Sequence, residues 1–297
     1  MVSISTPVSS ALRFVDSVAP SEMSTARTDS APAFMQAYVI IMVVLVVGGT
    51  LYDVIHKKSA KYFFDAAEKS KERGTRDVNG GEKVGIATQT LVSDVLTSAE
   101  FCNPKRRVAH LLGMYGFVIY LIATIVMVFS YADVSAATPA IWPLLWYLGA
   151  LMVCVGGYWF WFFIRVDVAA EGNSPLRIVR ADLFILSLLA SSTMGLLWAI
   201  TQSGGIGVLS NFFLGLYLLA TVALFAGVPW SKFAHMFFKP AAAYQKRVSV
   251  ANESMDNLPK PADRTKAEDR DRHSMELLKD APMNMGLGIK REQPNHY

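Results

Sequence analysis

Five apolar stretches, each about long enough to cross a lipid bilayer, dominate this chain of 297 residues. A membrane-spanning helix needs roughly 20 apolar residues to cover about 30 Å of hydrocarbon. Composition agrees, because 53% of the residues are hydrophobic and only 18% are charged, against about a quarter in soluble domains. We expect an all-α integral membrane protein with five transmembrane helices in a bundle. The predicted spans are residues 34–55, 108–131, 140–164, 181–201 and 208–230.

Basic residues lie in alternate connections between these spans. The connection 56–107 holds eleven lysines and arginines, and the connection 165–180 holds three arginines, whereas 132–139 and 202–207 hold neither. Cytoplasmic loops carry an excess of lysine and arginine. We therefore place residues 56–107, 165–180 and 231–297 in the cytoplasm, the N-terminus outside and the C-terminus in the cytoplasm.

The regions around the spans are polar. Residues 1–33 are rich in Ser, Ala, Thr and Pro without a long apolar run, which predicts a flexible periplasmic arm rather than a cleaved signal peptide. The membrane domain is predicted to cover 34–245, including the cytoplasmic loop 56–107. In that loop, residues 84–96 have apolar residues at near-helical spacing, which is typical of a helix on a membrane surface. Residues 246–297 predict a polar cytoplasmic tail that docks on a partner.

The sequence argues against several kinds of chemistry. Its two cysteines, Cys102 and Cys154, form no C-x-x-C pair, which argues against a cysteine-bound iron–sulfur cluster, a zinc site or a disulfide. The net charge of +4 follows the membrane topology and does not predict a nucleic-acid partner. The chain has no nucleotide-binding fingerprint, paired catalytic carboxylates or activated nucleophile, so any catalysis is expected in a partner.

Three histidines lie at the predicted cytoplasmic edge of the spans, while His273 and His296 lie in the tail. The three are His56, His110 and His235. Two imidazoles at equal depth on different helices are what a low-spin haem b requires, so His110 and His235 are candidate haem ligands. The alternative is that these histidines are polar anchors at the membrane interface.

Other polar and small residues near this edge also allow two interpretations. Arg107 and Lys232 contact a quinone or a haem propionate, or they simply mark the interface. Gly113 and Gly116 leave room for a flat ligand, or they let two helices pack closely. Asp53 and Asp182 are candidate proton carriers, with snorkelling or helix capping as the alternative.

Two motifs resemble the second and fifth spans of the respiratory nitrate reductase gamma superfamily. They are Arg107-Val-Ala-His-Leu-Leu-Gly-Met-Tyr-Gly-Phe117 and Trp230-Ser-Lys-Phe-Ala-His-Met-Phe-Phe-Lys-Pro240. Within that superfamily the chain is similar, over residues 35–245, to the membrane domain of the C subunit of the quinone-interacting oxidoreductase that partners adenylylsulfate reductase. A five-span chain without the iron–sulfur domain of that subunit resembles the membrane anchors of adenylylsulfate reductases in sulfur-oxidising bacteria.

The resemblance implies a function. A chain of this kind is a multi-pass subunit of the bacterial inner membrane that passes electrons between a soluble flavin/iron–sulfur partner, similar to adenylylsulfate reductase, and membrane quinone. Members with two haems have a second histidine deeper in each of the two helices, where this chain has Tyr120 and Tyr217. The resemblance therefore implies one haem b at most, near the cytoplasmic face. The alternatives are a cofactor-free membrane anchor for that partner and, less favoured, a small-solute transporter.

Overall fold

The computed structural model describes residues 30–56, 59–99, 101, 103–132, 138–165, 178–230, 235–256, 258 and 265–268. Every regular element in these ranges is a helix, and five of the described helices are long and apolar enough to cross a membrane. They are α3 (Ser30–His56), α6 (Pro104–Ser130), α7 (Ile141–Trp159), α9 (Leu183–Ser203) and α10 (Gly207–Ala226). The expected all-α fold with five spans is confirmed, and the chain is a multi-pass membrane protein.

When the π-helical segment that continues α7 to Ile164 is counted with that helix, the ends of the five spans lie within four residues of the predicted ends. The π-helical segment η3 (Phe160–Ile164) continues α7, and the short 3-10 helix η4 (Arg180–Asp182) precedes α9. Helix α6 starts four residues early because Asn103 caps it, accepting a hydrogen bond from the Lys105 amide at 2.9 Å, and Pro104 fits its first turn. Helix α10 ends before Pro229, which has no N–H to continue a helix. A single helix running from span five past His235, which the sequence allowed, does not form.

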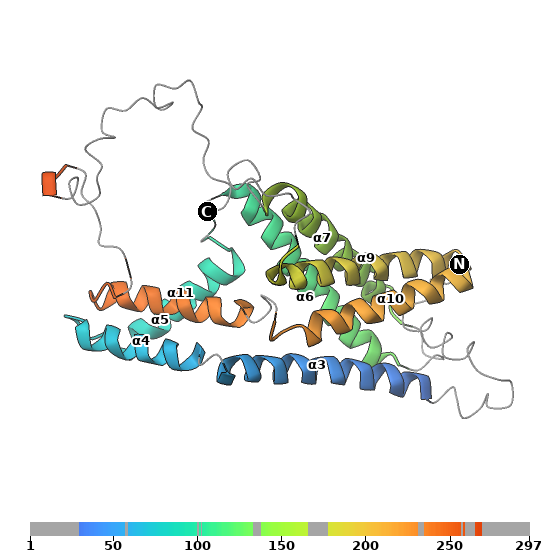
Figure 1. Cartoon of the computed structure of the whole chain (residues 1–297), viewed down its shortest axis with the longest axis horizontal. Coiled ribbons are helices and arrows are strands. Elements are labelled where there is room, and N and C mark those ends of the chain that lie inside the picture. The colour runs from blue at the N-terminus through green and yellow to red at the C-terminus, as the bar shows by residue number, and fades with distance from the viewer. Residues whose placement is uncertain are drawn as a thin grey trace, which may run out of the picture.

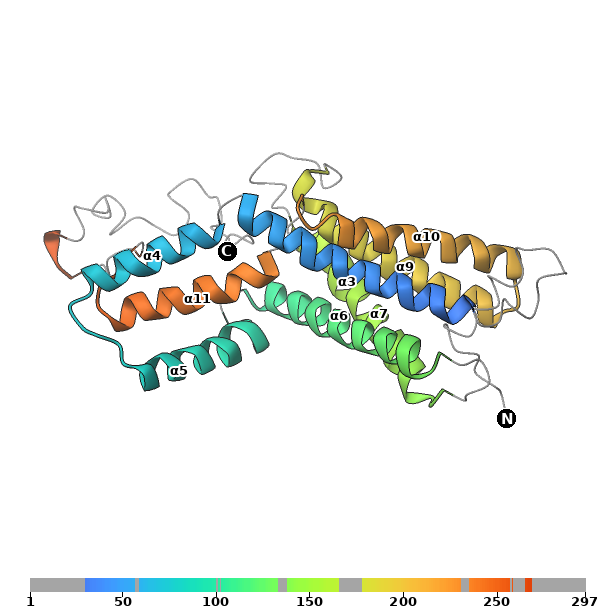
Figure 2. The same cartoon turned by 90° about the horizontal axis from the view of Figure 1, so that it is seen from below.

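Successive spans run in opposite directions (Figure 2). The end of α3, the start of α6, the end of η3, the start of α9 and the end of α10 therefore share one end of the bundle, which we call the basic end. Helix α6 packs on α7, α9 packs on α10, and α3 packs on α10 and α6. The outer surfaces are apolar, with Val44 61% exposed and Leu219 66% exposed, as expected for side chains that face lipid.

Glycines allow α6 and α7 to approach each other closely. A Cβ atom on Gly116 would lie 2.8 Å from the carbonyl oxygen of Gly149, and one on Gly149 would lie 2.7 Å from the carbonyl oxygen of Gly116. Nearer the basic end, a Cβ on Gly156 would lie 2.7 Å from the carbonyl oxygen of Ala109. This is the close backbone approach that small residues permit between membrane helices.

Four aromatic side chains fill the interior deeper in the bundle. The rings of Tyr120 and Trp146 are 5.0 Å apart, and those of Trp198 and Tyr217 stack at 5.8 Å. They surround Gly195, where a Cβ would lie 3.2 Å from the Tyr120 hydroxyl and 3.4 Å from the Tyr217 ring. Tyr120 and Tyr217 are therefore part of a packed aromatic core.

Beyond the basic end the chain forms a second group of helices, which we call the extension. Its members are α4 (Ser59–Arg73), α5 (Gly80–Gln89), the π-helical segment η2 (Thr90–Leu96) and α11 (His235–Ala251). Helix α11 packs against α4, α5 and η2 (Figure 1), and it lies between α4 and α5 when the molecule is seen from below (Figure 2). The region 56–107, predicted as a polar loop, is therefore largely helical, and α11 runs through residue 246, where composition placed the start of the tail.

Polar contacts hold the extension together. The Ser70 hydroxyl lies 2.9 Å from the Ser249 hydroxyl, and the Asn252 side-chain amide donates to the Ser70 carbonyl at 2.8 Å. The Asn252 carbonyl in turn accepts from the Thr75 amide at 3.1 Å. The expected helix over residues 84–96 forms, but Ile86 and Thr90 are buried and the helix runs beside α11 along the length of the molecule (Figure 2).

Candidate functional site

The candidate site lies at the basic end, where the first turns of α6 contact the segment that follows η2. His110 lies in the second turn of α6 and is exposed. Its Nδ1 atom is 3.1 Å from the Ser98 hydroxyl oxygen, and its ring centre is 5.0 Å from that of Phe101 at an interplanar angle of 47°. A histidine that bonds through Nδ1 presents Nε2 as its second ring nitrogen, the arrangement common among metal-binding histidines.

Three side chains of α6 bond to three consecutive residues at the end of η2, from Leu96, its last residue, to Ser98. The Tyr115 hydroxyl donates to the Leu96 carbonyl at 2.7 Å, and Arg107 Nε donates to the Thr97 carbonyl at 2.7 Å. His110 bonds to Ser98, the third residue. We call this set of contacts the clamp. It attaches the end of η2 to the first turns of α6 at three points.

The clamp places Arg107, which the sequence predicts as a candidate quinone or propionate contact. Its Nε donates to a backbone carbonyl, so part of the guanidinium attaches α6 to the neighbouring segment beside His110. Its neighbour Arg106 is half-buried, and its Nη2 donates to the Ile164 carbonyl at 3.5 Å. The basic residues at the start of α6 therefore contact backbone carbonyls of the segment after η2 and of η3.

Phe101 connects the start of α6 with the start of α11. Its ring centre is 5.0 Å from the His110 ring and 5.1 Å from the ammonium nitrogen of Lys239. Lys239 lies one helical turn after His235, the first residue of α11. The start of α6, which carries His110, therefore lies near the start of α11, which carries His235. The haem hypothesis requires this proximity of the two helices.

The other predicted site residues are placed less fully. The side chain of His235 and all of Lys232 lie outside the described residues. His56 is exposed at the end of α3, and its ring stacks on Tyr52 of the same helix at 5.1 Å. His56 thus lies at the basic end, and its described ring contact is within its own helix.

His110 is exposed, but farther along the same side of α6 the helix packs on the bundle. Phe117, two turns after His110, packs on a buried cluster of Val153, Leu188, Leu224 and Val228. One turn after His110, a Cβ on Gly113 would meet no described atom within 4 Å. The two glycines of the motif therefore differ: Gly116 packs against α7, whereas Gly113 leaves open space on the side toward which its Cβ would point.

The two acidic residues near span ends are both buried, and the structure shows the partners of Asp182. Asp182 forms an ion pair with Arg165 and accepts a hydrogen bond from the Val179 amide at 2.9 Å. The Arg165 guanidinium also lies 4.0 Å from the Trp161 ring centre. Asp182 therefore pairs with Arg165 and caps the start of η4 through the Val179 amide, contacts of the kind that the capping interpretation expects. Asp53 is 4% exposed within α3.

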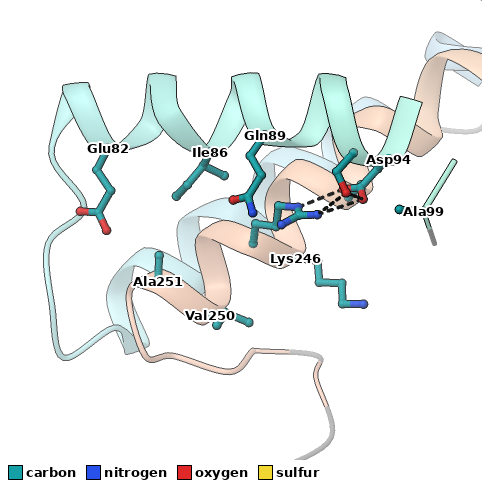
Figure 3. A pocket seen from close by; sticks show the side chains of 11 residues that line it. Glu82, Ile86, Gln89, Asp94, Ala99, Lys246, Val250 and Ala251 are labelled. Atoms are coloured by element: carbon teal, nitrogen blue, oxygen red, sulfur yellow. Dashed lines mark hydrogen bonds and ion pairs between the residues drawn. The ribbon is translucent and has the colours of Figure 1, made fainter. Parts of the chain in front are cut away.

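A cavity of about 550 Å³ lies in the extension, between α5 and η2 on one side and α11 on the other. Glu82, Ile86 and Gln89 line it from α5, opposite Val250 and Ala251 (Figure 3). At its end nearer the bundle, Arg247 makes two hydrogen bonds of 2.9 Å to the Asp94 carboxylate. These bonds lower the pKa of Asp94 below its ordinary value.

The sequence did not identify Ser98, Phe101 and Lys239 as site residues. A serine, a phenylalanine and a lysine in a long polar connection or an interfacial helix carry no distinctive spacing. Ser98 belongs to the site only because η2 ends where α6 begins, and that contact depends on the tertiary fold.

Comparisons with known proteins yield no relative: no protein family, no curated protein and no solved structure matches this chain. The resemblance to the nitrate reductase gamma superfamily therefore depends on the motifs around His110 and His235.

Proposed function

We propose that this chain is the membrane subunit of a respiratory oxidoreductase complex of sulfur metabolism, similar to the membrane anchors of adenylylsulfate reductases. It passes electrons between a soluble flavin/iron–sulfur partner and membrane quinone. The observation that carries the proposal is the convergence of α6 and α11 at His110, through the contacts of Phe101 with the His110 ring and with Lys239.

The described residues fit one haem b at the basic end. His110 bonds through Nδ1 to a hydroxyl, which suits iron coordination through Nε2, and the helix surface at Gly113 is open one turn away. His235 supplies the second ligand in this proposal. A bound haem b would transfer single electrons. Lys232 and the basic residues at the start of α6 would offset the negative charge of its propionates.

The deeper part of the bundle does not fit a second haem. Tyr120, Trp146, Trp198 and Tyr217 pack against each other and against Gly195 there, and tyrosine is an unusual ligand for an electron-transfer haem. Because the single proposed haem lies at the basic end, we propose that quinone reduction, which takes two electrons and two protons per quinone, also takes place there. His56 and Arg107 are the proposed quinone contacts.

The extension supports the proposed partner. It adds a helical surface beyond the spans, on the side where the basic residues gather, and its members come from both halves of the chain. In the proposal this side faces the cytoplasm of a bacterium, the N-terminus lies outside, and an adenylylsulfate reductase-like enzyme docks on α4, α5 and α11.

The second function is a cofactor-free membrane anchor for the same partner. The clamp favours it, because Arg107 and Tyr115 of α6 are both engaged in holding the segment after η2. In that case His110 is a structural residue whose ring bonds to Ser98, and electrons reach quinone without passing through this chain.

A difference spectrum tests the two functions. The chain is produced with ample haem supply, purified in mild detergent with its partner, and measured reduced minus oxidised. We expect a haem b band at about one haem per chain that disappears in His110→Ala and His235→Ala. His273→Ala in the tail is the matched control and retains the band. A wild-type complex without the band would contradict electron transfer through haem and support the anchor.

A further inference from the structure

We propose that Ser98 is a positioning residue for His110: its hydroxyl oxygen accepts a hydrogen bond from Nδ1–H and so selects the tautomer whose Nε2 can coordinate iron. The inference rests on the proposed function, because it states how His110 is held in the tautomer that an iron ligand needs. It concerns a residue of the segment after η2 that lies outside both sequence motifs.

Ser98 is buried, and its backbone conformation is unusual for a residue that is not glycine. Ser98 is 1% exposed, and its oxygen lies 3.1 Å from His110 Nδ1. Its backbone has φ of 48°, in the left-handed region that residues other than glycine rarely adopt. Such conformations persist where the surrounding structure determines them, and they gather at functional sites. A glycine would remove this strain, but it would have no hydroxyl.

The surrounding contacts hold the Ser98 backbone in place. The clamp fixes the carbonyls of Leu96 and Thr97 through Tyr115 and Arg107, and the Ala99 amide donates to the Ser93 carbonyl at 2.9 Å. Residues on both sides of Ser98 are therefore attached, so its hydroxyl reaches Nδ1 from a fixed direction. This sets the ring orientation of His110 as well as its tautomer.

The direction of the hydrogen bond decides the chemistry. If Nδ1–H donates to the serine oxygen, Nε2 carries a lone pair and can bind iron. If the serine donates to Nδ1, the neutral ring carries its proton on Nε2 and cannot bind iron through that nitrogen. The proposed function requires the first arrangement, and an iron ligand is commonly held by such a second bond.

Two substitutions at Ser98 and one at its neighbour test the proposal. Ser98→Ala removes the hydroxyl, and Ser98→Gly removes it while accommodating the positive φ, so that one variant folds without backbone strain. Thr97→Ala is the matched control, because the Thr97 hydroxyl donates to the Ser93 carbonyl at 2.8 Å and the side chain is exposed. It removes a hydroxyl from the same segment without touching His110.

The first measurement is made without haem. Nitrogen NMR of full-length protein with labelled histidines, with His110→Ala used for assignment, reports which ring nitrogen carries the proton. We expect Nδ1–H at His110 in the wild type and in Thr97→Ala, and a mixture of tautomers in both Ser98 variants. Nε2–H in the wild type, or Nδ1–H that survives in Ser98→Gly, would overturn the proposal.

The second measurement uses the haem-loaded complex. We expect both Ser98 variants to bind haem about 10- to 100-fold more weakly than Thr97→Ala, with altered low-spin resonance signals. Unchanged affinity and signals would overturn the positioning role. A wild type that binds no haem but has the expected tautomer contradicts the proposed function alone, so the two failures are distinguishable.

Discussion

Gly116 offers a direct test of how α6 and α7 pack. In Gly116→Ala, the added Cβ would lie 2.8 Å from the Gly149 carbonyl oxygen, 2.8 Å from Met152 Cβ and 2.9 Å from the Val153 amide nitrogen. None of these atoms can rotate away, because they belong to the backbone or are attached directly to it. The two helices must therefore move apart by about half an ångström to restore an ordinary contact of 3.4 Å.

The expected cost follows from overpacking a close-packed interior, which is about 1–3 kcal/mol of unfolding free energy. Gly113→Ala is the matched control, since its Cβ meets no described atom within 4 Å and alanine favours helix by about 1 kcal/mol at most. Unfolding by added denaturing detergent, followed by tryptophan fluorescence, measures both. Equal stability of the two variants, or a larger loss in Gly113→Ala, would refute the described packing.

Two further perturbations address ion pairs. Asp182→Ala is expected to destabilise the bundle by roughly 3 kcal/mol in the same titration, because it removes a partner from a largely buried pair whose Arg165 retains its contact with Trp161; a loss below that of an exposed pair would show that the pair is not buried. In the extension, Arg247 depresses the pKa of Asp94 below 3.8, so the pair stabilises the docking of η2 on α11 fully above about pH 4 and loses that contribution as pH falls through the lowered pKa. The protection of residues 84–96 against hydrogen exchange, corrected for the intrinsic rate at each pH, should therefore fall only in acid. Arg247→Met should lower this protection at pH 7, and identical protection in the two proteins at pH 7 would contradict the contact.

The membrane part of the fold could be predicted from sequence because one physical requirement determines it. An apolar stretch of about 20 residues in lipid must satisfy its backbone hydrogen bonds internally, so it forms a helix. The misplaced ends have local causes, such as the cap at Asn103 and the turn before Pro229. Neither cause appears in hydropathy, which measures side chains rather than backbone bonding.

The extension and the clamp were not predictable in the same way. The polar connection 56–107 folds because α11, from the other end of the chain, covers Ile86 and Thr90. Likewise, His110 was identified from its type and position, but Ser98 required knowledge of where η2 ends. The sequence thus identified His110 as the candidate ligand, whereas its hydrogen-bond partner Ser98 could be found only in the tertiary structure.

The contact between Ser70 and Ser249 spans 179 residues, and this has a consequence for biosynthesis. At about 5–20 residues per second, the ribosome needs roughly 10 to 40 seconds to make the chain between them. During that time α4 and α5 have emerged while the last helix that covers them has not. The extension can therefore be completed only after all five spans have been translated, so a nascent chain cannot offer the finished surface of the extension before its membrane part exists.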